Sequence, residues 1–337
     1  MTDGYVKLSD VCAKASSNIA QKDLEGHTGA YPIYGASGYI ADIDFYQQED
    51  EYIAIVKDGA GVGRTMLLPA KSSVIGTLQY IIPDKKKVDI RYLFFAIVNM
   101  ELGRYFSGAT IPHIYFRDYQ HEVFKLPDLV QQKKFADILQ YIERLTEARK
   151  RQLSKLDDFV KSRFVEMFGD PVYNSKELPT KRGIDFFKLS NGKFVPESRR
   201  FESGIPAYGG NGISWYTDDA ITQKDTLVVG RVGFQSGNVH FAKGPLWITD
   251  NAMYISDYNA DKYDLIFLCA LMQHIDFTRF QDAGDLKKIT QKPFMNMEYI
   301  LPTLSKQHEY VAFVAQTDKS KFDVQNFLRK GYVRCEI

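Results

Sequence analysis

The chain has 337 residues, of which 45% are hydrophobic and 25% charged, ordinary values for a soluble chain that folds into about two domains. Its 43 basic and 42 acidic residues give a net charge of +1, so the chain as a whole is not attracted to nucleic acid. Any DNA-binding surface must be a local concentration of Lys and Arg. Cys12, Cys269 and Cys335 form no CxxC pair, which argues against a disulfide framework or a zinc site and favours a cytoplasmic protein. No apolar run reaches the roughly 18 residues of a membrane span, and the opening MTDGYVKLSD lacks a signal-peptide pattern.

Residues 1–127 combine short β-rich runs with Gly-rich loops. The run YIAIV (52–56) is bounded by Gly and Asp clusters, as strands are. A short helix is predicted near residues 90–102. This texture indicates a first globular module of mixed α and β structure.

Residues 128–168 predict one long helix, because they contain no Gly and no Pro and their apolar residues recur in steps of three and four. Asp128 is placed to cap the first turn, and Gly169, followed by Pro171, supplies the stop. A helix of this length spans roughly 60 Å, so its apolar stripe needs a second helix as a partner. The stripe consists of Phe135, Ile138, Ile142, Leu145, Leu153, Leu156, Val160, Phe164 and Met167.

Residues 169–303 repeat the texture of the first module, with a β-rich run TLVVG (226–230) and a short helix predicted near 262–274. Residues 304 to about 330 predict the second long helix. We expect this helix to pack antiparallel on the central one, because each helix follows its own module. Its apolar side would carry Val311, Val314, Phe322, Val324, Phe327 and Leu328.

An internal repeat organises the whole chain. YPIYGASG (31–38) returns as IPAYGGNG (205–212), and the same offset of 174 residues places Lys57 on Arg231 and Gly59 on Gly233. Further matches are 73–82 with 247–256, 92–97 with 266–271 and, after a one-residue slip, 124–139 with 299–314. The predicted fold class is therefore α+β: two mixed α/β modules joined by two long antiparallel helices, a dumbbell with a pseudo-two-fold internal duplication.

Patterns typical of catalysis are absent. KDGAGVGRT (57–65) resembles a phosphate-binding loop, but it is one residue short and has Arg in the position of the lysine. The six histidines show no metal-ligand spacing. Neither a nucleophile elbow, a kinase signature, an amino-methyltransferase motif nor a paired-acid nuclease motif is found. The absence of these motifs favours a recognition or scaffold protein. It predicts no metal site and no catalytic residue in this chain.

Three loops with Gly, aromatic and basic residues recur at matched positions of the two modules: 34–38 with 208–212, 57–64 with 231–238, and 108–117 with 283–292. Arg, Lys, Gln and Asn offer the donor patterns that read guanine and adenine edges in the major groove. Glycine lets the backbone approach a ligand closely. The alternative is that the glycines only make hairpin turns and the cations are solvated. For Tyr34 and Tyr208, packing is preferred over base stacking.

Through these motifs the chain resembles the specificity subunit of a type I restriction–modification system. The resemblance covers essentially the whole chain and rests on YPIYGASG, on KDGAGVG and above all on the helix ending LSKLDDFVKSRFVEMFGD (153–170). It implies two target-recognition domains, 1–127 and 169–303, that each read one half of a split, asymmetric DNA site. The central helix (128–168) and the C-terminal helix and tail (304–337) would form a coiled coil that acts as spacer.

The resemblance also implies partners. Two methyltransferase subunits, which carry the S-adenosylmethionine site, and restriction or translocase subunits, which use ATP and Mg, would join the chain on double-stranded DNA, with no membrane. This chain would hold no cofactor and would perform no catalysis. The helix residues expected to dock partners are Phe135, Ile142, Leu153, Leu156, Phe164, Met167, Val314 and Phe322.

The recognition loops implied by the resemblance are Tyr34–Gly38, Lys57–Arg64 and Thr110–Arg117, and in the second module Tyr208–Gly212, Arg231–Asn238 and Asp285–Lys292. The predicted DNA-binding residues of the first module are Tyr34, Gly35, Ser37, Lys57, Gly59, Arg64, Thr110, His113, Tyr115 and Arg117. Those of the second are Tyr208, Gly209, Asn211, Arg231, Gly233, Gln235, Asn238, Lys287, Lys288, Thr290 and Lys292.

Two alternatives stay open. The second helix is shorter than the first, so part of the central helix is expected to lack an intrachain partner. The chain could therefore be a scaffold or decoy subunit that organises methyltransferases without reading DNA. The other alternative is a nucleotide-dependent enzyme that uses the loop 57–65.

Overall fold

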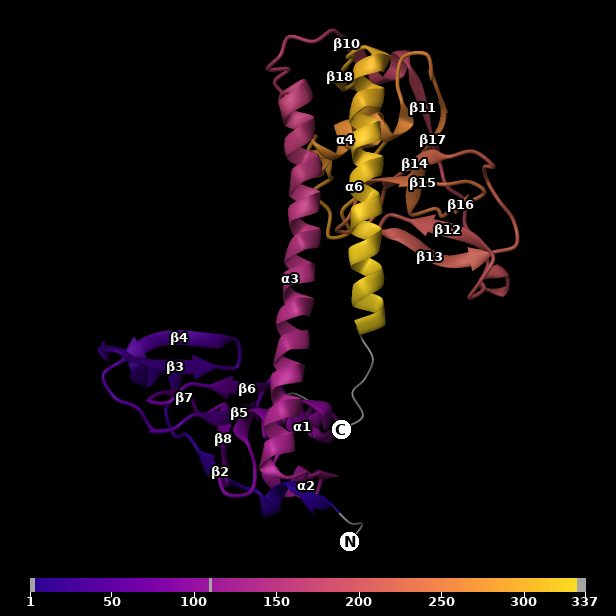
Figure 1. Cartoon of the computed structure of the whole chain (residues 1–337). Helices are drawn as coiled ribbons and strands as arrows, with labels where there is room; N and C mark the ends of the chain where they lie inside the picture. Colours follow the sequence, from indigo (N-terminus) through magenta and orange to yellow (C-terminus); the bar gives the residue numbers. More distant parts are fainter. Residues whose placement is uncertain (1–3, 109–110, 332–337) are drawn as a thin grey trace. The chain divides into compact units, whose positions relative to one another are not determined.

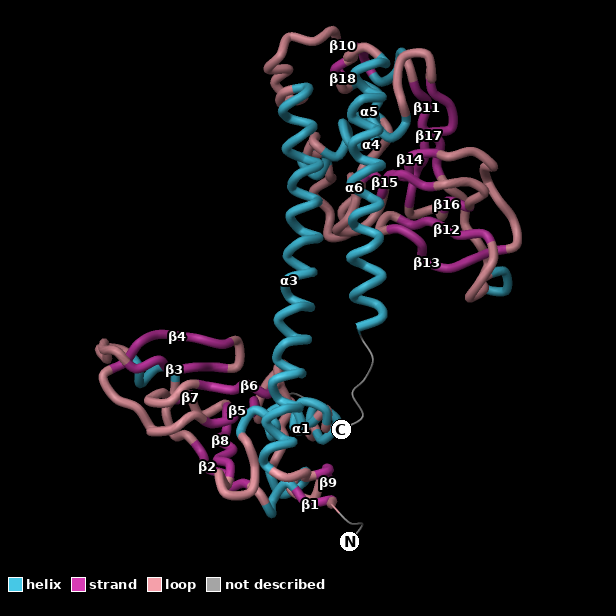
Figure 2. Tube along the Cα trace, viewed as in Figure 1, coloured by secondary structure: helices cyan, strands magenta, loops and turns pink. Residues whose placement is uncertain are grey.

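The computed structural model describes residues 4–108 and 111–331, shown in Figures 1 and 2. The chain forms two compact units, one with the residues up to Ala148 and those from Leu328 on, and one from Arg149 to Phe327. The long helix α3 (Leu129–Phe168) contributes its first half to one unit and its second half to the other. Within the described residues, the helices are all too short or too polar to span a membrane.

The first module is built on three mostly antiparallel sheets. Its strands are β1 (Tyr5–Lys7), β2 (Cys12–Ser16), β3 (Tyr31–Gly35), β4 (Gly38–Ile43), β5 (Tyr52–Val56), β6 (Thr65–Leu68), β7 (Ser73–Val74), β8 (Leu78–Pro83) and β9 (Val123–Lys125). Its helices are α1 (Ile90–Asn99), α2 (Phe116–Tyr119), and the 3-10 helices η1 (Leu8–Asp10), η2 (Gln21–Leu24) and η3 (Leu102–Tyr105). The strand orders are β2-β8-β5-β6, β4-β3-β7 and β1-β9. All five residues of β5 are buried, as expected for an apolar run in the middle of a sheet.

The second module has the same plan (Figure 2). Its strands are β10 (Thr180–Arg182), β11 (Phe187–Asn191), β12 (Ile205–Gly209), β13 (Gly212–Thr217), β14 (Thr226–Gly230), β15 (Val239–Ala242), β16 (Trp247–Ile248), β17 (Ala252–Tyr258) and β18 (Glu298–Ile300). Its helices are α4 (Leu265–Gln273), α5 (Lys292–Asn296), and the 3-10 helices η4 (Gly183–Asp185), η5 (Glu197–Arg199) and η6 (Phe277–Phe280). The strand orders are β11-β17-β14-β15, β13-β12-β16 and β10-β18, which match the first module strand for strand.

The matching topology confirms the duplication and corrects one part of its alignment. Asp89 caps α1 by accepting hydrogen bonds from the backbone N–H groups two and three residues on, and Asp264 caps α4 in the same way. These two caps are one residue further apart than the strands β3 to β8 are from their counterparts β12 to β17. The pairing of 92–97 with 266–271 is therefore wrong by one residue, because the slip occurs before the short helices and not after them.

The central helix begins and ends as predicted. The Asp128 carboxylate accepts a hydrogen bond from the backbone N–H of Gln131 at 2.8 Å, which caps the first turn. Gly169 has φ +76°, a left-handed conformation that glycine adopts without strain and that ends a helix. The second long helix is α6 (Leu304–Gly331), with 28 residues against the 40 of α3.

Within the second unit, α6 packs antiparallel on the second half of α3. Three pairs show the direction, because the α6 number rises as the α3 number falls. They are Arg163 with Glu309 (3.3 Å), Phe159 with Phe313 (ring centroids 5.0 Å apart) and Asp157 with Lys321 (2.7 Å). The predicted antiparallel pairing is therefore confirmed over this part of the helix.

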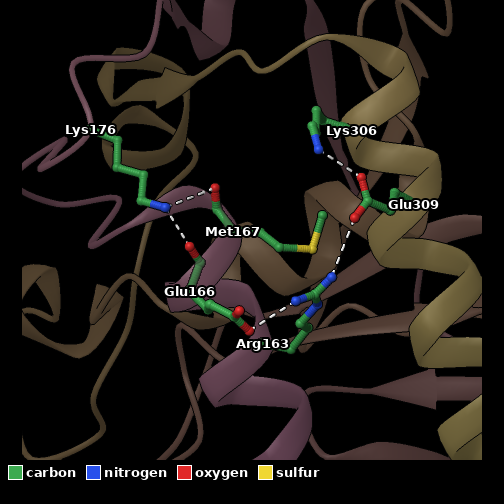
Figure 3. A network of polar contacts seen from close by, with 6 residues as sticks. All are labelled: Arg163, Glu166, Met167, Lys176, Lys306 and Glu309. Atoms are coloured by element: carbon green, nitrogen blue, oxygen red, sulfur yellow. Dashed lines mark hydrogen bonds and ion pairs between the residues drawn. The ribbon is translucent and has the colours of Figure 1, made fainter.

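A polar network holds the ends of these helices together (Figure 3). Arg163 donates to Glu166 on its own helix at 2.9 Å and to Glu309 on α6 at 3.3 Å. Lys306 also donates to Glu309, at 2.8 Å. The Lys306 ammonium and, less strongly, Arg163 hold the pKa of the Glu309 carboxyl below its usual range. Lys176, in the segment after α3, donates to backbone carbonyls of the last turn of α3.

The apolar stripe of α3 has two different environments. In the second unit, Phe164 is 0% exposed and stacks between Phe267 and His274 in the core of that unit. In the first unit, Phe135 and Ile138 are 47% and 55% exposed. The first half of the stripe thus faces solvent over much of its surface.

A buried glutamine fixes the start of each long helix to its module. The Gln132 side chain accepts from the backbone N–H of Asp89 (2.8 Å) and donates to the carbonyls of Lys87 (3.1 Å) and Pro127 (2.8 Å). In the second module, Gln307 makes the equivalent three bonds, each 2.8 Å long, to the Asp264 N–H and to the carbonyls of Lys262 and Pro302. The N-cap of the short helix and the start of the long helix are thereby joined in both modules.

Candidate nucleic-acid interface

The second loop of each module has one backbone frame. In the first module, Gly63 donates to the carbonyl of Val56 (2.8 Å), and Val56 donates to that of Arg64 (2.9 Å). In the second module the matched bonds run from Gly237 to Gly230 (2.8 Å) and from Gly230 to Asn238 (2.9 Å). The glycines at 59, 63, 233 and 237 all have positive φ, a conformation that side chains with a Cβ rarely adopt.

The frame argues against a nucleotide site. A phosphate-binding loop connects a strand to the N-terminus of a helix, whereas residues 57–64 connect the antiparallel strands β5 and β6. The matched loop 231–238 connects β14 and β15 in the same way. Residues 57–65 therefore resemble a P-loop in sequence but not in structure.

The third loop lies against the second in both modules. In the first module, the Gly59 N–H donates to the Pro112 carbonyl and the Ile114 N–H to the Lys57 carbonyl, both at 2.9 Å. The equivalent bonds of the second module are Gly233 to Lys287 (2.8 Å) and Ile289 to Arg231 (3.0 Å). Residues more than fifty positions apart in sequence are thus joined in each module. Thr110 lies outside the described residues.

The first loop contacts the second as well. Arg64 Nη1 donates to the carbonyl of Ala36 at 2.7 Å. In the second module, glycines replace this contact: a Cβ on Gly230 would lie 3.0 Å from the Gly210 carbonyl oxygen and 2.6 Å from that of Gln235. The three loops predicted from the repeat therefore meet in each module.

Several predicted DNA-binding side chains of the first module already have a partner within the chain. Asp58 lies 2.7 Å from His113 Nδ1 and 3.8 Å from Lys57 Nζ. Arg117 lies over the ring of Tyr115, with its guanidinium carbon 4.8 Å from the centroid. Ser37, Tyr115 and Arg117 are exposed. Lys57 and His113 would have to leave Asp58, or share it, to contact a ligand.

The second module leaves its donors less constrained. Arg231 Nη1 and Lys287 Nζ each make a bond of 3.4 Å to a backbone carbonyl, that of Asp250 and that of Asp282. The Asn238 amide donates to the Gln235 side chain. The remaining predicted polar residues, Asn211, Lys288, Thr290 and Lys292, are exposed.

The two loop tyrosines pack against their own modules. Tyr34 packs on the core that contains Ile33 and Tyr52, and Tyr208 packs on the core around Ile248. Burial raises the pKa of both phenols. Gly35 and Gly209, which follow these tyrosines, are buried. The preference for packing over base stacking agrees with these contacts.

The helix residues predicted to dock partners differ in exposure. Phe135, Ile142 and Phe322 are exposed, at 47%, 39% and 60%. The half-buried residues are Leu153, Leu156, Met167 and Val314. Phe164 is fully buried in the second unit and is therefore inaccessible to a partner. Its packing partners come from α4 and α6, which sequence periodicity does not reveal.

Sequence reasoning missed two features. The glutamines Gln132 and Gln307 occupy matched positions in LPDLVQQ and LPTLSKQ, and their recurrence was the available signal. Phe234, at the tip of the second loop of the second module, is 88% exposed. An aromatic residue between Gly233 and Gln235 was visible in the sequence. Among the described residues, no cluster of three or more His, Cys, Asp or Glu could hold a metal ion.

Comparisons with known proteins also divide the chain into two similar halves. The sequence pattern of the family described as "Type I restriction modification DNA specificity domain" matches the chain twice, over residues 4–157 and 177–330. The type I restriction enzyme MjaVIII specificity subunit of Methanocaldococcus jannaschii is 24% identical over 217 residues, which are 57% of this chain and 50% of that protein. A Mycoplasma genitalium protein named as a type I specificity subunit is 20% identical over 234 residues, 64% of this chain and 58% of its own length. The chain thus spans only half or somewhat more of these relatives.

The fold is similar to a solved structure over almost its full length. The crystal structure of the type I restriction–modification system S subunit from M. genitalium superimposes with a TM-score of 0.69 and 14% sequence identity. The match covers 98% of this chain and 92% of that one. At this identity, the likeness establishes the fold.

Proposed function

The chain belongs to the family of type I restriction modification DNA specificity domains, and from this premise we propose that each module reads one half of a split, asymmetric DNA site. The repeated loop frame carries the proposal. Equivalent hydrogen bonds join the second and third loops in both modules, while Lys57 stands where Arg231 does and Ala60 where Phe234 does. One frame with different side chains suits two readers of different base sequences. We place the recognition domains at residues 1–127 and 169–303.

The long helices would set the distance between the two half-sites and dock methyltransferase subunits. Solvent-exposed apolar side chains at Phe135, Ile142 and Phe322 support a docking role, because such side chains gain free energy when a partner covers them. Phe164 is left out of the proposed surface. Restriction or translocase subunits would join the same assembly. S-adenosylmethionine, ATP and Mg would be bound by these partners, and the chain itself would be a non-catalytic subunit.

A scaffold that holds methyltransferases without reading DNA is the second candidate. The difference in helix length favours it, since α6 has 28 residues and α3 has 40. Part of α3 is then without the helix partner that a second helix of equal length would supply. The paired state of Lys57 and His113 with Asp58 also reduces the free donors of the first module.

Methylome sequencing of cells that express the chain together with a cognate methyltransferase subunit tests both candidates. We expect a split motif. A second strain would carry the same chain with residues 1–127 exchanged for another such module, and only one half of its motif should change. If neither strain shows a methylated motif while the methyltransferase still co-purifies with the chain, the scaffold function replaces sequence reading.

A further inference from the structure

The tip of the second loop in the second module presents an exposed apolar side chain. Phe234 is 88% exposed, the highest value among the large hydrophobic side chains in the described part of the chain. Exposure of a phenyl ring to water is unfavourable. At the tip of a loop proposed to read DNA, such a ring is accessible to a ligand.

The exposure of Phe234 is held in place by its surroundings. The Ser236 N–H donates to the Gly233 carbonyl (3.0 Å) and Gly237 donates to Gly230 (2.8 Å), which closes the turn on both sides of the ring. Gln281 Nε2 also donates to the Ser236 carbonyl at 2.7 Å. A ring presented by a hydrogen-bonded turn loses little conformational freedom on binding.

The fold of the loop does not require the aromatic ring. In the first module, Ala60 occupies the matched position, and the Val62 N–H bonds the Gly59 carbonyl (3.1 Å) as Ser236 bonds Gly233. The two loops have the same frame with a methyl group in one and a phenyl ring in the other. Phe234 is therefore dispensable for local structure.

Basic residues lie near the ring, together with the Asp282 carboxylate, which accepts from the Lys288 backbone N–H at 2.9 Å. Arg231 begins the same loop, and the Gly233 N–H bonds the carbonyl of Lys287 on the third loop at 2.8 Å. Lys288 follows, and Leu286, which is 56% exposed, precedes Lys287. An apolar tip among cations is complementary to a nucleic acid, whose phosphates flank apolar base methyl groups and faces. If the ring instead bound an apolar surface of another protein, that partner would offer these cations no negative charge.

We propose that Phe234, with Leu286 on the third loop that pairs with its own, is a specificity-determining residue that packs against the 5-methyl group of a thymine in the half-site read by the second module. Apolar side chains distinguish thymine through this methyl group in the major groove. The inference rests on the proposed function, because it requires that the second module contacts bases. It also predicts that the first module, with Ala60, makes no such contact from this position.

The test uses the full chain in complex with its methyltransferase subunits. Equilibrium binding at one fixed salt concentration would be measured for a duplex with the methylome-defined motif and for duplexes with each thymine of the second half-site replaced by uracil. Uracil lacks only the methyl group. We expect Phe234→Ala to weaken binding of the cognate duplex about tenfold, and Phe234→Leu to weaken it less.

The uracil duplexes identify the contact. One uracil position should weaken wild-type binding and leave binding of Phe234→Ala unchanged, because the variant has already lost the methyl contact. Tyr173→Ala is the matched control, since this ring is 82% exposed and lies outside the loops; it should bind as the wild type does. Thermal unfolding of each variant should be unchanged.

Three results would overturn the inference. They are an unchanged affinity of Phe234→Ala, an equal loss on cognate and non-cognate DNA, and relaxed specificity with no sensitivity to uracil. The failure of the proposed function is a separate outcome, because it would appear in the wild type as an absence of sequence preference. In that case Phe234 would also have no base contact to make.

Discussion

Replacement of Gln307 by alanine perturbs the second module at a defined point. The side chain is 0% exposed and makes three hydrogen bonds of 2.8 Å, to the Asp264 N–H and to the carbonyls of Lys262 and Pro302. Its removal leaves three backbone groups without this partner. It also disconnects the start of α6 from the N-cap of α4.

The expected cost follows from these bonds. A typical intramolecular hydrogen bond contributes about 1 kcal/mol net, and a buried group left unpaired costs about 1–3 kcal/mol. Three bonds therefore predict that Gln307→Ala lowers the free energy of unfolding of the second module by about 3 kcal/mol. Gln132→Ala should have a similar effect on the first module, since Gln132 is 1% exposed and makes the matched bonds.

Native-state hydrogen exchange measures the two effects separately. Gln307→Ala should speed exchange in α4 and in the first turns of α6, with less change in α1, and Gln132→Ala should do the reverse. Gln131→Ala is the control, because Gln131 is exposed beside the buried Gln132. A loss below about 0.5 kcal/mol in Gln307→Ala, the range of ordinary surface substitutions, would refute the reasoning, as would an equal loss in Gln131→Ala.

Three further predictions concern single side chains. Arg231→Ala should relax discrimination in one half-site by about 1–3 kcal/mol in competition binding, if the guanidinium bonds a guanine with two donors; equal weakening on all sequences would assign it to phosphate. Lys321→Ala removes a 2.7 Å ion pair to α3 whose carboxylate is 58% exposed, so denaturant unfolding should shift by less than about 1 kcal/mol, and a much larger loss would contradict this screening argument. Burial raises the pKa of Cys12 and Cys269 to about 12, so in a Cys335→Ser variant a thiol reagent at pH 8 should react slowly until denaturant is added; rapid reaction of the folded chain would show that the thiols are accessible.

The long elements of the fold were predictable from local sequence. The predicted central helix, 128–168, is observed as Leu129–Phe168, because its periodicity, its cap at Asp128 and its stop at Gly169 all act within a few residues. The repeat likewise predicted that the two modules share one topology. Its alignment failed by one residue near α1 and α4, where apolar runs match equally well in either register.

The candidate site was predictable only in outline. The repeat identified the three loops, but the state of their side chains depends on neighbours distant in sequence. His113 lies 2.7 Å from Asp58, which also pairs with Lys57, because the third loop bonds the second. The exposure of Phe234 and the burial of Phe164 have the same origin, since burial depends on what the rest of the chain places against a side chain.

The sequence by itself determined the duplication, the two long helices and the positions of the loops, because periodicity, caps and glycines act through short-range sterics and hydrogen bonds. Tertiary structure decided which loops meet, which cations are already paired and which half of the α3 stripe is covered. These outcomes depend on hydrogen bonds and packing between residues tens to more than a hundred positions apart, such as Gly233 with Lys287 and Phe159 with Phe313. No local pattern specifies such contacts until strands and helices have paired.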